Sequence, residues 1–139
     1  MINDLIDFLN DSPVNFLAVK TIASMLDEAG YQRIDPEDKL PQLNAGSKIY
    51  TTKNDSSIYA FRIGNQPMAD AGFRMICAHC DSPTFRIKPN AEMTSEGGIV
   101  RLNTEVYGGP IMSTWMDRPL SLAGRVILKT DNVMRPKTE

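Results

Sequence analysis

The period of the hydrophobic pattern changes once along the chain, at residue 48, and this change most constrains how the chain can fold. Before it, apolar residues recur at helical spacing over residues 2–10 and again over 16–26, which predicts two helices. We expect Ser12-Pro13 to cap the second helix, its apolar stripe to form core, and Gly30 to end it. After residue 48 apolar and polar residues alternate, which predicts five or six strands and no further helix.

Turn residues separate these expected strands. A loop over residues 31–46 precedes them, residues 53–56 form a hairpin turn, and Pro89-Asn90 forms a second turn. The expected strands lie at residues 49–51, 58–63, 73–79, 85–88, 98–107 and 120–129. Residues 129–133 then resemble a strand that runs into a turn without a partner strand beyond it, so we expect a cut chain rather than a finished fold.

Composition and charge exclude several classes of function. The 139 residues suffice for one ordinary domain, and a net charge of −2 offers no electrostatic footprint for nucleic acid or an anionic membrane. No apolar stretch has the length of a membrane-spanning helix, and the acidic start of the chain is unlike a secretory signal. Two cysteines do not make a disulfide framework. We therefore predict a cytoplasmic protein with neither nucleic acid nor membrane as its partner.

The only histidine, His79, stands at the end of an expected strand. On an extended chain residues i and i+2 project to the same face, so His79 and Asp81 would reach the same space. A carboxylate near an imidazole is typical of metal sites, where it orients the ring. The pair therefore predicts the start of a metal site, although a His-x-Asp pattern is short and also fits a packed or surface histidine.

The neighbouring Cys77 and Cys80 leave two other interpretations open. A thioredoxin-type redox dithiol requires a helix after the motif, whereas the residues after Asp81 predict extended chain. A zinc knuckle requires further Cys or His ligands, and the sequence has none. We expect Cys77 to pack in the core and Cys80 to lie beside the site. Gly108-Gly109-Pro110 predicts a backbone corner, since no helix follows it to bind a phosphate.

Several segments together resemble one family, the M18 metallo-aminopeptidases, also called the aspartyl aminopeptidase family. The resemblance runs across nearly all 139 residues and is most specific in the long segment that contains Trp115-Met116-Asp117-Arg118. The segments that carry it are Ala78–Pro83, Phe85–Asn90, Asn103–Pro110 and Ser113–Val126, with Ser12-Pro13 and Phe16–Val19 near the start.

The resemblance implies a two-zinc exopeptidase that removes N-terminal residues, often acidic ones, from peptides. Carried over residue by residue, His79 matches the first zinc ligand, and Asp81 matches the catalytic-site aspartate that orients and polarises that histidine. Cys80 stands where threonine is usual, and Leu17 where histidine is common. Other divalent metals are compatible with this pattern of ligands.

The resemblance also implies a domain organisation within an α/β fold. Residues 1–88 would be the N-terminal part of a zinc-exopeptidase-type catalytic domain with N-terminal helices and a mixed β-sheet. Residues 89–139 would begin an inserted β-rich domain through which the full-length protein forms a homo-oligomer. Family members extend far beyond residue 139, so we expect this chain alone to be inactive. The alternatives are a non-catalytic assembly module and a dithiol redox protein that uses Cys77 and Cys80.

Overall fold

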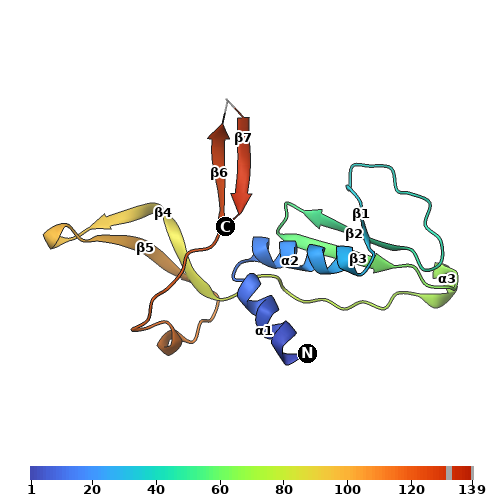
Figure 1. Ribbon diagram of the computed structural model, residues 1–139, viewed down its shortest axis with the longest axis horizontal. Coiled ribbons are helices and arrows are strands. Elements are labelled where there is room, and N and C mark those ends of the chain that lie inside the picture. Colours follow the sequence, from blue (N-terminus) through green and yellow to red (C-terminus); the bar gives the residue numbers. More distant parts are fainter. Residues whose placement is uncertain (131–132, 139) are drawn as a thin grey trace. The chain divides into compact units, whose positions relative to one another are not determined.

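Two helices open the chain, as predicted: α1 (Ile2–Asp11) and α2 (Asn15–Glu28) (Figure 1). The prediction that Ser12 caps α2 is wrong, because Ser12 instead follows the last turn of α1, where its N–H donates to the carbonyl of Leu9. The residue before α2 is the extended Val14, which makes no side-chain cap. A residue that caps the start of a helix directly precedes that helix, whereas Ser12 lies three residues before the first residue of α2.

As predicted, α2 stops before Gly30: its last residue is Glu28, and Gly30 follows the cap residue Ala29. Gly30 has φ +78°, and its N–H donates to the carbonyl of Asp27, while the N–H of Tyr31 donates to the carbonyl of Leu26, both at 2.9 Å. This pair of bonds is the Schellman arrangement, which satisfies the last carbonyls of a helix and requires a left-handed residue.

A small three-stranded sheet follows, in the order β1-β2-β3. β2 (Lys48–Lys53) and β3 (Ser57–Arg62) form the predicted hairpin, and Asn54 and Asp55 at its turn both have φ +53°. Two consecutive left-handed residues are typical of the type I′ turn, whose twist matches that of the flanking strands. β1 (Gln32–Arg33) pairs parallel to β2 inside the predicted loop. Two residues are too few to give a periodic signal, so the pattern missed this strand.

The buried core lies where α2 meets this sheet. In the described residues the buried side chains are Ala18 and Val19 of α2 and Ile49 and Tyr50 of β2. The Tyr50 hydroxyl donates a hydrogen bond of 2.9 Å to Asp27 Oδ1, and burial, with the Asp27 carboxylate beside it, raises the pKa of Tyr50 above its usual range. The predicted apolar stripe therefore supplies the helical half of the core.

The segment after β3 differs from its prediction. A four-residue helix, α3 (Met68–Ala71), breaks the expected run of strands, and residues 72–83 carry no helix or strand. Phe73, Met75 and Ile76 are 74%, 88% and 101% exposed. The predicted strand ending at His79 is therefore wrong in this structure, because no described strand pairs with its backbone and no described layer covers its apolar side chains.

A long antiparallel hairpin comes next, β4 (Thr84–Thr94) paired with β5 (Val100–Tyr107). The predicted turn at Pro89-Asn90 is wrong. β4 continues through it with a register shift between Ile87 and Glu92, as expected where proline lacks the N–H that a ladder needs. The chain reverses instead at the 3₁₀ turn η1 (Glu96–Gly98). A second such turn, η2 (Met112–Thr114), follows β5.

The last hairpin pairs β6 (Arg125–Thr130) with β7 (Val133–Thr138). The predicted strand over 120–129 begins five residues late, at Arg125, and the expected turn over 129–133 falls partly on residues 131–132, outside the described chain. β7 is the partner strand that the sequence pattern did not predict. The pattern missed it because Pro136 interrupts the alternation of apolar and polar residues in this strand. The structure describes residues 1–130 and 133–138.

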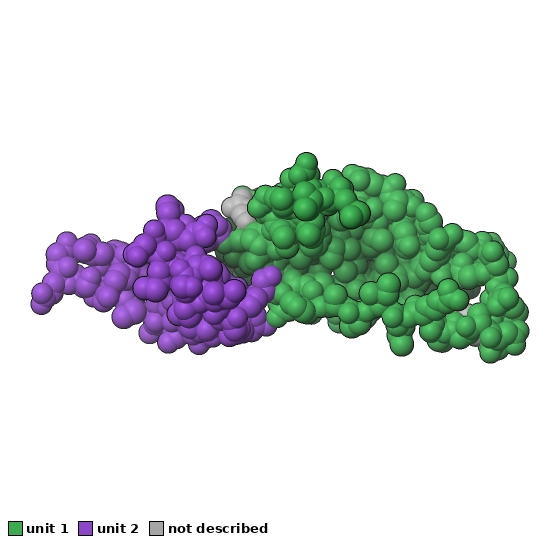
Figure 2. Space-filling model, turned by 90° about the horizontal axis from the view of Figure 1, so that it is seen from below, with its two compact units in different colours: residues 1–81, 123–139 green, residues 82–122 purple. Residues whose placement is uncertain are grey.

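These elements form two compact units, residues 1–81 with 123–139 and residues 82–122 (Figure 2). Helices with small sheets, of which β1-β2-β3 is mixed, confirm the predicted α/β class. The expected boundary at residue 89 between a catalytic and an inserted domain stays a prediction. Among the described residues, no helix is both long and apolar enough to cross a bilayer.

Candidate metal-binding segment

The structure brings His79 and Asp81 together. His79 lies in the extended segment after α3 and its side chain is 80% exposed. Its Nδ1 lies 2.7 Å from the main-chain carbonyl oxygen of Asp81 and 3.2 Å from Asp81 Oδ1. Both contacts join residues two positions apart on an extended chain. The His-x-Asp spacing therefore brings the two residues together by itself.

These contacts decide which ring nitrogen is available to a ligand. A carbonyl and a carboxylate oxygen are both acceptors, so the Nδ1 that faces them carries the proton of the neutral ring. The lone pair is then on Nε2. Metal-bound histidines commonly donate their other ring N–H to a carboxylate or carbonyl in this way, which fixes the tautomer and raises the basicity of the ligating nitrogen.

The donor set fits one ligand of a metal, but not a whole site. In the part of the chain that the structure describes, no three His, Cys, Asp or Glu side chains gather closely enough to hold a metal ion. A catalytic zinc needs three protein ligands and an open position. The described residues therefore supply one imidazole that is oriented to bind a metal, and they do not form a complete zinc centre.

The two cysteines flank His79 in the sequence, and both are free thiols. Cys77 is exposed and Cys80 is half-buried, so the expectation that Cys77 packs in the core is wrong. Its segment has no strand partner and no covering layer among the described residues, which explains the exposure. β4 follows the motif, and the helix N-terminus on which a thioredoxin-type dithiol depends is not there.

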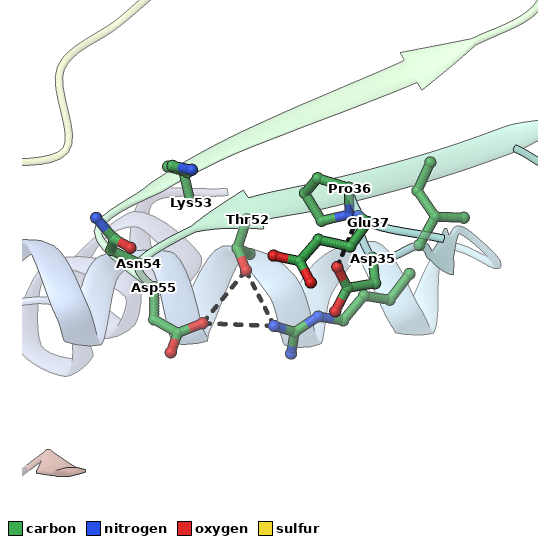
Figure 3. A pocket seen from close by; sticks show the side chains of 9 residues that line it. Asp35, Pro36, Glu37, Thr52, Lys53, Asn54 and Asp55 are labelled. Carbon is green, nitrogen blue, oxygen red and sulfur yellow. Dashed lines mark hydrogen bonds and ion pairs between the residues drawn. The ribbon is translucent and has the colours of Figure 1, made fainter. Parts of the chain in front are cut away.

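A second polar feature, which the sequence did not predict, is an open cavity of about 560 Å³ beside the β2–β3 turn (Figure 3). Arg33 Nη2 donates to Thr52 Oγ1 at 2.9 Å and lies 3.4 Å from Asp55 Oδ1, and Thr52 Oγ1 donates to the same carboxylate at 3.2 Å. Asp35 accepts the N–H of Glu37 at 2.9 Å. Neither His79 nor Asp81 lines the cavity, and its Arg33–Asp55 pair is largely exposed, so this ion pair adds little to stability.

Comparison with known families and structures identifies the class of protein. The family model described as "Aminopeptidase I zinc metalloprotease (M18)" matches residues 8–138. The "Probable M18 family aminopeptidase 2" of Clostridium novyi is 53% identical over 99% of this chain and 31% of its own length. Its counterpart in Ectopseudomonas mendocina is 45% identical over 94% of this chain and 30% of its own.

Solved structures agree. A chain of the cryo-EM structure of the Ape4 and Nbr1 complex superposes with a TM-score of 0.88 at 36% identity, covering 97% of this chain and 26% of that one. Chaetomium thermophilum mApe1 gives 0.85 at 34% identity, covering 99% of this chain and 31% of that one. The mApe1 dodecamer of S. cerevisiae gives 0.82 at 26% identity, covering 98% of this chain and 32% of that one.

The chain belongs to the M18 family of aminopeptidase I zinc metalloproteases. It spans 31% of the length of the Clostridium relative and 30% of the length of the Ectopseudomonas relative. The predicted family and the predicted zinc-exopeptidase-type fold are thereby confirmed.

Proposed function

We propose that this chain is the amino-terminal part of a zinc-dependent aminopeptidase that removes N-terminal residues, chiefly acidic ones, from peptides. The single observation that carries the proposal is the family match over residues 8–138, within which lies an exposed imidazole whose Nδ1 faces only acceptors. A zinc metalloprotease needs histidine ligands whose tautomer is fixed in this way, whereas a surface histidine without function needs no fixed tautomer.

His79 is the metal ligand in this proposal, and Asp81 is the residue that orients it. The Asp81 carbonyl and carboxylate hold the Nδ1 proton, keep Nε2 unprotonated and limit rotation of the ring. Zinc, when bound, lowers the pKa of a coordinated water to about 7 and polarises the scissile carbonyl. The remaining ligands and the general base come from polypeptide outside these 139 residues.

Three further features belong to the proposal. The complete active site holds two zinc ions, other divalent metals being compatible with it. The full-length protein is a homo-oligomer in which the β-rich segment from residue 89 takes part, and one of its structural relatives is a dodecamer. The chain of residues 1–139 alone is inactive, because it holds no complete metal site among its described residues. The cytoplasmic location and the exclusion of nucleic-acid and membrane partners stay predictions.

The test uses a protein of the relatives' full length that contains these residues. His79→Gln should abolish tight zinc binding at the site and hydrolysis of an aspartyl-anilide. Asp81→Asn should lower both by about 10- to 100-fold, the usual effect of removing the partner that orients a metal-bound histidine. Zinc retained against a chelator and kcat/KM are the two measurements.

Asp70→Asn is the matched control, since it removes another carboxylate of the same unit, on α3. It should leave zinc retention and turnover unchanged. A His79→Gln protein that keeps its zinc and its turnover contradicts the proposal.

A further inference from the structure

We draw no further inference here: the strongest candidate, the apolar face of the β4–β5 hairpin on which Ile87, Leu102 and Val106 are exposed, carries nothing, because nothing in the described part of the chain shows what covers it.

Discussion

At the scale of single residues, position relative to neighbours decides roles that residue type only suggests. Ser12 is a good helix cap by type, yet it ends α1, and its buried hydroxyl finds no partner among the described residues. His79 and Asp81 meet because their contact needs only two residues of extended chain. Contacts this local can be predicted from sequence, whereas a capping role depends on where the preceding helix stops.

Tyr50 provides a test of the core at the same scale. Its hydroxyl donates to Asp27, so Tyr50→Phe should destabilise the fold by about 1 kcal/mol at neutral pH. Its pKa is raised in the folded state, so the stability due to the neutral phenol is complete below about pH 10 and is lost as pH rises through the folded pKa. Urea unfolding between neutral pH and pH 11 measures both effects.

Tyr59→Phe is the control for this measurement, because Tyr59 is 56% exposed on β3. It should change neither the stability at neutral pH nor its decline in alkali. A Tyr50→Phe chain whose stability falls with pH as steeply as that of the unmodified chain would refute the assignment to Tyr50.

At the scale of elements, long-range side-chain contacts attach the last hairpin to α2 and to the β2–β3 turn within the same unit. Arg125 at the start of β6 donates to the carbonyl of Asn54 at 2.8 Å, and its guanidinium lies 4.0 Å from the ring centroid of Phe16. Residues 71 positions apart make this hydrogen bond, so no local pattern predicts it.

Arg125→Ala should therefore loosen β6–β7 and lower stability by about 1 to 2 kcal/mol, the sum of a modest hydrogen bond and a cation–π contact. Amide hydrogen exchange in β6 and β7 should accelerate, while exchange at Ile49 and Tyr50 changes less. Arg135→Ala on exposed β7 serves as the comparison. Equal effects of the two substitutions would mean that the Arg125 contacts contribute nothing specific.

The segment before His79 makes a second prediction about an element. Phe73, Met75 and Ile76 put apolar side chains on both faces of an extended chain, as in strands covered on both sides. Among the described residues the amides of 73–79 make no backbone hydrogen bond. In the 139-residue chain these amides should exchange nearly as fast as unfolded peptide, in contrast to those of β2. Protection equal to that of β2 would show that the segment has a partner within this chain or in a second copy.

At the scale of the whole molecule, burial is small for the length of the chain. Four described residues are buried, all in one unit, while large apolar side chains such as Leu5 on α1 and Val100 on β5 remain exposed. Exposed apolar surface of this kind marks contacts with other polypeptide. This exposed apolar surface is also the reason to consider a non-catalytic assembly module as the alternative function. The chain spans 31% of the length of its Clostridium novyi relative.

The isolated chain should therefore show no aminopeptidase activity. Hydrolysis of an aspartyl-anilide with added zinc should equal that of zinc alone, because the described residues gather no three metal donors. Size-exclusion of the same sample reports whether the exposed strands associate. Turnover that depends on the chain and disappears in His79→Gln would contradict the expectation.

The sequence by itself determined the features that depend on residues close together in the chain. Helical periodicity located α1 and α2, the Asn54-Asp55 turn joined β2 to β3, and two-residue spacing brought His79 to Asp81. Only the tertiary structure decided that Pro89 lies inside β4, that β1 joins β2, and that Arg125 contacts Phe16. These features depend on ladders and contacts between residues far apart in the chain, whose free energy exists only after the chain has closed the loops between them. The segment before His79 shows the same limit, because an apolar pattern becomes a strand only when another strand pairs with it.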